Sequence, residues 1–306
     1  MAGRPLRKEI KYTLLFWFVK LLIFLSGIVP RSSWLRFCGF LGWLGYLFSP
    51  KPRAQSLTHL TMVFGDEKSP EEIKKLSRRM FTMIGKNSGE LIRSSNVKSL
   101  ADLEKIMVVK GYENVEKEHA RGNGIIFLAC HLGAFDLMVT YVSLRGLQPM
   151  IVGTALKDER LNALILGYRN AHGAVAVERG KETVKLFKGL KRGGSTAVLI
   201  DQDTKVKSRF VNFFNIPAAT PIGATILALK SGASVIPSYI YLGEDNKQHI
   251  TFLPAIEPVF SGDEETDLIV NTQNYTRYIE QVVRAHPDQW VWMHERWKTR
   301  PGQEIR

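Results

Sequence analysis

The residues best suited to chemistry in this chain lie in the run His131-Leu132-Gly133-Ala134-Phe135-Asp136. The run follows an apolar segment, residues 124–130, which predicts a buried strand. Ligands and reacting groups in α/β proteins lie at the carboxyl ends of strands. A histidine at this place could act as a general base, and a nearby carboxylate could fix its tautomer and stabilise its protonated form.

The spacing of His131 and Asp136 restricts how the two side chains can meet. Five residues of α-helix rotate by about 500°, so the pair would not share a helix face. They can meet only if the chain turns between them, and Gly133 suits such a turn because glycine adopts positive φ readily. The alternative is a loop histidine followed by an aspartate that begins a helix, and the spacing does not decide between the two.

Length and charge narrow the class of protein. A chain of 306 residues can bury a large core in one or two domains. The formal net charge is +13, and residues 1–60 contribute most of it, with nine Lys or Arg against one acid. This distribution favours an anionic membrane surface as partner over nucleic acid, for which no motif is visible. The two cysteines, Cys38 and Cys130, suggest neither a disulfide framework nor a zinc site, and a reducing compartment is expected.

The N-terminal segment is strongly apolar. Residues 12–29 carry one charge, Lys20, and basic residues precede them. This length is at the lower limit for a spanning helix. We predict an uncleaved anchor with its basic flank in the cytoplasm. Lys20 and the aromatic content suit an interfacial helix equally, and a soluble helix pair is a further alternative. We therefore divide the chain into N-terminal membrane-associated helices, residues 1–55, and a catalytic domain, residues 56–306.

The rest of the chain alternates between strand and helix patterns. Ser69 and Pro70, followed by two glutamates, predict a helix start. The alternation beyond it predicts an α/β fold, with a central, mostly parallel sheet flanked by helices. The predicted strands are 108–109, 124–130, 150–154, 174–177, 195–200, 234–242 and 249–253, and the helices are 134–145, 159–171, 183–190, 222–230 and 264–284.

Three further clusters could belong to a site. Asp201-Gln202-Asp203 follows a predicted strand and should lie at the same sheet edge as His131, although a plain Asx turn would explain it too. Arg169 and Arg179 flank a short strand and could hold phosphates. Residues 289–300 mix aromatics with cations, and could pack under the site, lie against lipid headgroups or cap the core. Nucleophile-elbow, Walker A and dinucleotide-binding patterns are absent from the sequence.

Taken in order along the chain, these segments are distinctive. A basic N-terminal apolar segment precedes HLGAFD, the two arginines, DQD, FVNFFNIPAATPIG and PDQWVWMHERWKTRP. In this respect the chain resembles the lipid A biosynthesis acyltransferases, the late lauroyl and myristoyl transferases. They belong to the lysophospholipid/glycerolipid acyltransferase superfamily, whose hallmark is a histidine and an acid with four residues between them. One departure is Asn215, where we expect glycine after the paired phenylalanines.

The resemblance implies a reaction and a set of site residues. His131 would be the catalytic base and Asp136 its partner, accepting the second imidazole N–H while a hydroxyl attacks an acyl thioester. Arg169, or Arg179 as a competing match, would hold a phosphate or stabilise the oxyanion. The remaining residues expected to bind substrate are Gly133, Ala134, Phe135, Asp201, Gln202 and Asp203.

The resemblance also implies partners and a location. Acyl carrier protein would be the acyl donor and a membrane glycolipid the acceptor, with no metal and no organic cofactor. The enzyme would lie at the bacterial inner membrane with its catalytic domain facing the cytoplasm. A basic helix face could dock the acidic carrier, although a solvated surface explains it better: Lys185, Lys188, Lys191 and Arg192.

Two alternatives remain open at this point. A member of the same family could act on another glycolipid or phospholipid acceptor, such as a phosphoinositol mannoside. A membrane thioesterase would instead pass the acyl group to water.

Overall fold

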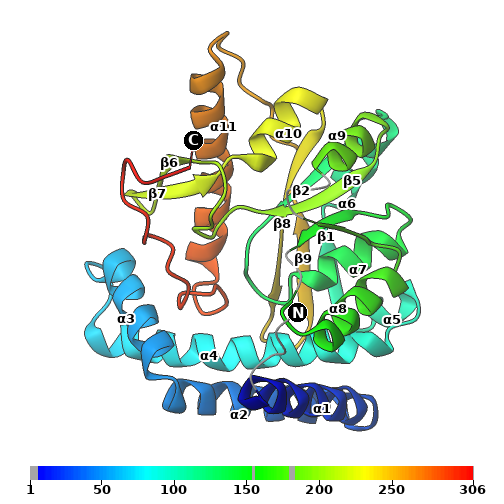
Figure 1. Cartoon of the computed structure of the whole chain (residues 1–306), viewed down its shortest axis with the longest axis vertical. Helices are drawn as coiled ribbons and strands as arrows, with labels where there is room; N and C mark the ends of the chain where they lie inside the picture. Colours follow the sequence, from blue (N-terminus) through cyan, green and yellow to red (C-terminus); the bar gives the residue numbers. More distant parts are fainter. Residues whose placement is uncertain (1–5, 154–155, 179–182, 306) are drawn as a thin grey trace.

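The computed structural model describes residues 6–153, 156–178 and 183–305. The chain begins with helices that lie along one side of the molecule (Figure 1). The helix predicted from Ser69 is confirmed, because the Ser69 hydroxyl accepts from Glu72 N and the Glu72 carboxylate accepts from Ser69 N. The helices of this N-terminal part are α1 (Leu6–Ile28), α2 (Arg31–Phe48), α3 (Pro50–Phe64) and α4 (Pro70–Arg93).

Helix α2 packs directly on α4 through glycines. A Cβ on Gly42 would lie 2.2 Å from the Phe81 carbonyl oxygen, and one on Gly85 would lie 2.2 Å from the Cys38 carbonyl oxygen. The two backbones therefore touch, which larger residues at these positions would prevent. Residue 55, our boundary between N-terminal helices and catalytic domain, falls within α3, and that division stays a prediction.

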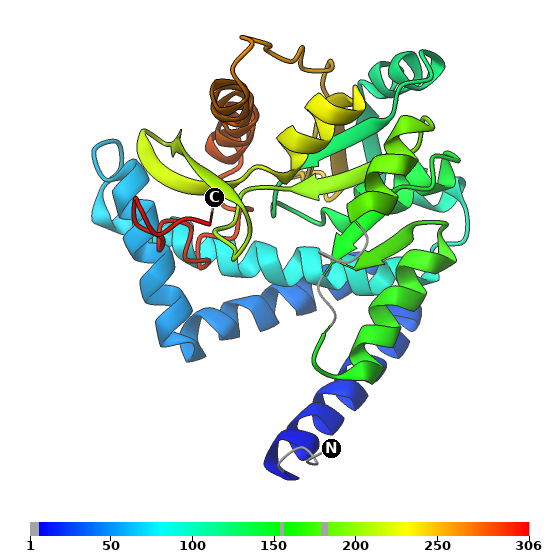
Figure 2. The ribbon, with the colours of Figure 1, turned by 45° about the horizontal axis from the view of Figure 1, so that its top comes forward.

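Helix α1 extends from the rest of the ribbon (Figure 2) and leaves its apolar side chains exposed. Among the described residues it is the one helix long and apolar enough to cross a membrane, and only 11% of its apolar window is buried. Its inner side packs on α4 through Leu22 and Ser26. The predicted apolar helix is thus present, and it starts earlier than residue 12 because the basic residues before it join the same helix.

Within the described residues a seven-stranded sheet forms the centre, in the order β1-β9-β8-β2-β5-β3-β4. The five strands from β8 to β4 are parallel, while β9 runs antiparallel to β8 and pairs in parallel with β1. The mostly parallel sheet is confirmed. Its strands are β1 (Met107–Lys110), β2 (Ile125–Ala129), β3 (Met150–Gly153), β4 (Val175–Glu178), β5 (Ser195–Leu199), β8 (Ser234–Leu242) and β9 (Gln248–Phe252).

Strand β2 is buried on both faces and divides the core in two. Ile126 and Leu128 face a cluster built with α4, α9, α10 and α11, while Ile125 and Phe127 face one built with α7. This explains why the strand is apolar at every position. The remaining helices are η1 (Ser94–Asn96), α5 (Leu100–Glu104), α6 (Tyr112–Ala120), α7 (Asp136–Leu144), α8 (Glu159–Ala171), α9 (Thr183–Lys191), α10 (Gly223–Ser231) and α11 (Glu264–Ala285).

A separate hairpin, β6 (Ser208–Phe213) and β7 (Ile216–Pro221), was not predicted. Its turn holds Phe214 at φ 54° and Asn215 at φ 59°. Asparagine tolerates this left-handed region, so it can stand where we expected glycine. The hairpin packs on α11, and Phe214 N donates to the Glu280 carboxylate at 2.7 Å.

Candidate active site

His131 and Asp201 meet because their strands are neighbours in register. Strand β2 pairs in parallel with β5, and Ala129 lies opposite Leu199. Two residues beyond each strand end stand His131 and Asp201. The imidazole Nδ1 lies 2.8 Å from Asp201 Oδ1, and His131 N donates to Asp201 Oδ2 at 2.8 Å. The predicted position of both residues at one sheet edge is therefore correct.

The surroundings of Asp201 fix its charge. Its side chain is fully buried and accepts a third hydrogen bond, 2.7 Å from Trp290 Nε1. Burial opposes the charged form, but the neighbouring His131 charge and the three hydrogen bonds outweigh it, and the pKa of the Asp201 carboxyl lies below its usual value. An ionised carboxylate only accepts, so Nδ1 of His131 carries a proton, and in the neutral imidazole Nε2 is the nitrogen that can take one.

Asp136 does not have the predicted role of accepting from the imidazole. Its Oδ1 accepts from Arg169 Nη2 at 2.9 Å, while Nδ1 of His131 lies on Asp201. The chain does turn at Gly133, whose φ is 62° and whose Cβ would lie 2.2 Å from the Ile240 carbonyl oxygen. That turn ends where α7 begins at Asp136, so the carboxylate faces the last turn of α8 rather than Nδ1 of the imidazole.

The helix that carries Arg169 is held by a buried polar network. The Tyr168 hydroxyl lies 2.8 Å from Ser94 Oγ and 2.7 Å from Thr140 Oγ1. His172 Nε2 lies 2.9 Å from the Val97 carbonyl oxygen. These contacts tie α8 to α7 and to the end of α4. Within the described part of the chain, Arg169 Nε is buried without a hydrogen-bond partner. Arg179, the competing arginine, lies outside the described residues.

The three residues of the Asp201-Gln202-Asp203 loop have different partners in the structure. Asp203 accepts from Thr299 N at 2.8 Å and from Thr299 Oγ1 at 2.9 Å, so it anchors the C-terminal tail. Asp201 and Asp203 are 2% and 3% exposed, and the hydrogen bonds described here are made within the protein; their predicted contact with substrate stays a prediction. Gln202 is half-buried, and its predicted contact stays a prediction.

The residues between His131 and Asp136 also differ from one another. Ala134 is fully buried in the core, and its predicted contact with substrate stays a prediction. Phe135 is half-buried, and its ring stands edge-on to the imidazole with centroids 5.2 Å apart. Gly133 N donates to the Gln289 carbonyl oxygen at 3.1 Å, so its backbone is used by the fold.

Trp290 is the site residue that the sequence did not single out. The C-terminal tail had three open placements, and the structure packs it under the site. Leu132 forms an antiparallel bridge with Trp290, and Asp201 accepts from the indole N–H. The signal in the sequence was the clustering of aromatics in the tail, which did not indicate which ring would reach a carboxylate.

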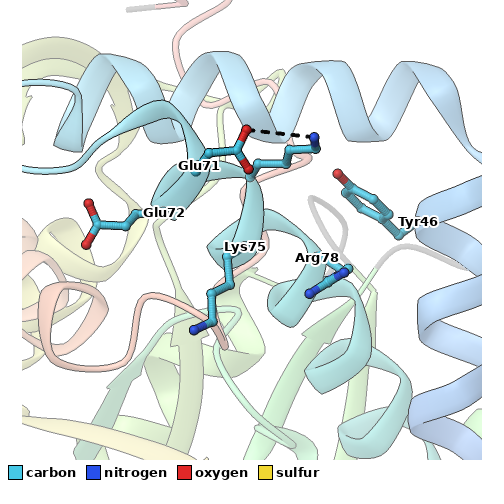
Figure 3. A pocket seen from close by; sticks show the side chains of 6 residues that line it. Tyr46, Glu71, Glu72, Lys75 and Arg78 are labelled. Atoms are coloured by element: carbon cyan, nitrogen blue, oxygen red, sulfur yellow. Dashed lines mark ion pairs between the residues drawn. The ribbon is translucent and has the colours of Figure 1, made fainter.

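A surface hollow in the described part of the chain lies away from the histidine–carboxylate pair. This open hollow of about 400 Å³, between α2 and the first turns of α4, is lined by none of the site residues (Figure 3). No group of three or more His, Cys, Asp or Glu side chains in the described ranges is arranged to hold a metal ion. The residues that line the hollow are Tyr46, Glu71, Glu72, Lys74, Lys75 and Arg78.

The fold and site define an α/β enzyme with a histidine–carboxylate pair at the ends of adjacent parallel strands. Residues 3–299 match the family described as bacterial lipid A biosynthesis acyltransferase, and the chain belongs to this family of acyltransferases. The predicted family is thereby confirmed.

Three relatives illustrate the breadth of the match. Lipid A biosynthesis acyltransferase 2 of Shigella flexneri is 24% identical over 292 residues, which cover 94% of this chain and 91% of that protein. Lipid A biosynthesis lauroyltransferase of Escherichia coli K12 is 26% identical over 197 residues, 63% of this chain and 62% of that protein. Phosphatidylinositol mannoside acyltransferase of Mycobacterium tuberculosis H37Rv is 25% identical over 195 residues, 62% of this chain and 60% of that protein.

Proposed function

We propose that the protein transfers a fatty acyl group from an acyl thioester to a hydroxyl of a lipid A precursor, with His131 as general base and Asp201 as its partner. The observation that carries the proposal is the 2.8 Å contact between Nδ1 and the buried, ionised Asp201 carboxylate. This contact leaves Nε2 as the proton acceptor. The imidazole is 25% exposed, so a substrate can reach it while its partner stays dry.

The reaction needs no acyl-enzyme. Nε2 of His131 takes the proton of the acceptor hydroxyl as its oxygen attacks the thioester carbonyl carbon. The carbon–sulfur bond then breaks, and the imidazolium returns the proton to the departing thiolate. Cys130, the nearest thiol in sequence, is an unsuitable nucleophile because burial and the Asp201 charge raise its pKa well above the usual value.

Arg169 supplies the positive charge of the proposed site. Its guanidinium is mostly buried and paired with Asp136, and its Nε has no partner among the described residues. A cation in this setting suits an acceptor phosphate or the oxyanion that forms on the acyl carbonyl. We assign Asp136 to hold Arg169 rather than to relay a proton.

We further propose that α1 and α2 seat the enzyme on the inner membrane, with the catalytic domain in the cytoplasm. Large apolar residues of α1 recur on one exposed side, and α2 adds exposed Phe37, Phe40 and Phe48. The first turns of α1 carry Arg7, Lys8 and Lys11, as expected for a cytoplasmic flank. The exposed row of α1 is Ile10, Leu14, Trp17, Leu21, Phe24 and Ile28.

The donor and the acceptor are the parts of the proposal that most need a test. Acyl carrier protein is the proposed donor. The likeness to a phosphatidylinositol mannoside acyltransferase supports a second candidate, the same transfer to a mannoside acceptor. The observed site chemistry suits either acceptor, because both present a hydroxyl.

The direct experiment is an acyl-transfer assay on detergent-solubilised protein. Labelled acyl–acyl carrier protein is offered with a lipid A precursor, a phosphatidylinositol mannoside or no acceptor, to wild type and to His131→Ala. We expect label in the lipid A precursor with wild type, and a rate lower by about 10²–10⁴-fold for the variant, the usual contribution of a positioned base. Unchanged thermal unfolding and vesicle co-sedimentation would show that the variant is intact.

Each other product pattern contradicts part of the proposal. Label in the mannoside alone would change the acceptor, and free fatty acid formed without acceptor would identify a thioesterase. Full activity of intact His131→Ala would remove the proposed base.

A further inference from the structure

Trp290 is the part of the C-terminal tail that reaches the proposed catalytic pair. Its side chain is 1% exposed, and Nε1 donates to Asp201 Oδ2 at 2.7 Å. The same oxygen accepts from His131 N at 2.8 Å, while Oδ1 faces Nδ1. The indole therefore occupies the side of the carboxylate that is turned away from the imidazole ring.

The tail around Trp290 is built onto the loop that carries His131. Trp290 bridges Leu132 in antiparallel fashion, and Gly133 N donates to the Gln289 carbonyl oxygen at 3.1 Å. The indole packs edge-on against Phe213 at 5.5 Å and against Trp292 at 4.7 Å between centroids. Since the ring is held on two sides, its N–H is fixed toward Asp201.

We propose that Trp290 is a positioning residue for the acyl transfer, whose indole N–H sets both the orientation and the basicity of Asp201. This inference rests on the proposed function, since it assigns a third member to the same histidine–carboxylate pair. Trp290 does not touch a substrate, and it acts through Asp201 on His131.

Two physical consequences follow from this hydrogen bond. With Oδ2 held by two donors, the carboxylate cannot rotate, so Oδ1 stays aligned with Nδ1. Each donor also delocalises the carboxylate charge and weakens its hold on protons. Removing the indole N–H should leave a more basic carboxylate, which stabilises the imidazolium more strongly. His131 would then stay protonated, and unable to act as a base, up to a higher pH.

The test is the pH profile of kcat/KM for Trp290→Phe, with Trp34→Phe as matched control. Trp34 is equally buried, between α2 and α4, and its Nε1 donates to the Gly89 carbonyl oxygen at 2.8 Å. We expect the acid limb of the Trp290→Phe profile to move to higher pH by up to about one unit, the size expected for one charged hydrogen bond. The Trp34→Phe limb should stay in place, whatever stability that variant loses.

A second route keeps the test decisive if Trp290→Phe unfolds. Replacement of Trp290 with 3-benzothienylalanine preserves shape and volume but puts sulfur where the N–H stood, and the same shift is expected. An unmoved acid limb in a folded variant, or an equal shift in Trp34→Phe, would overturn the inference. Wild type that transfers no acyl group would overturn the proposed function instead, so the two failures are distinguishable.

Discussion

Asp201 and Asp136 lie on two sides of the same histidine loop, and their environments differ sharply. Asp201 follows a central strand, is buried and binds the imidazole. Asp136 begins a helix, is partly exposed and binds Arg169 at the end of another helix. A carboxylate at a helix N-terminus and a cation at a helix C-terminus each complement the helix dipole. The comparison shows that strand register, more than sequence proximity, determined which acid became the histidine's partner.

We expect the largest loss of activity when the hydrogen bond between His131 and Asp201 is removed. Asp201→Asn should lower kcat by about 10²–10⁴-fold, because the amide can neither fix the Nδ1–H tautomer nor stabilise the imidazolium. Asp203→Asn is the matched control, since Asp203 has the same burial and loop but binds Thr299. We expect the control to lose stability and keep most of its kcat. Equal loss of kcat in both variants would mean that the loop acts as a unit.

We expect a smaller loss of activity when the ion pair between Asp136 and Arg169 is broken. Asp136→Asn leaves the mostly buried Arg169 without its carboxylate, and Arg169→Gln removes the cation. Each should reduce kcat/KM by about 10–10²-fold, and the double variant should be little worse than either, because residues in one ion pair are coupled. Steady-state kinetics on the four proteins gives the coupling. A loss for Asp136→Asn as large as that for Asp201→Asn would contradict our division of roles.

Much of the secondary structure could be predicted from the sequence, and one hairpin could not. Strand and helix periodicity predicted the sheet well, and β8 and α8 have the predicted bounds, 234–242 and 159–171. The β6–β7 hairpin escaped prediction because its turn uses Phe214 and Asn215 at positive φ, without glycine. Short strands with an unusual turn give little local signal.

The sequence predicted which edge of the sheet carries the site, but it could not predict which side chains hydrogen-bond to each other there. Every parallel strand ends at that edge, so His131, Asp136 and Asp201 were all candidates to meet. Only the register of β2 on β5 brings residues 131 and 201 together. Trp290 was beyond reach for a related reason. Its contact joins positions 89 residues apart through aromatic packing, which has no periodicity in the sequence.

The smallest expected effect is a difference between wild type and Asp201→Asn in how the free energy of unfolding depends on pH. The pKa of Asp201 is lowered in the folded protein, chiefly by the His131 charge and three hydrogen bonds acting against burial. A depressed carboxyl pKa contributes stability that is present above the unfolded value, here 3.8, and is lost as the pH falls through the folded value. Urea unfolding of wild type and Asp201→Asn should therefore show a stability gap near about pH 7 that narrows below about pH 4. A gap that stays constant through the acid range would mean that the Asn variant is weakened by packing alone, and that the charge of Asp201 contributes to catalysis without stabilising the fold.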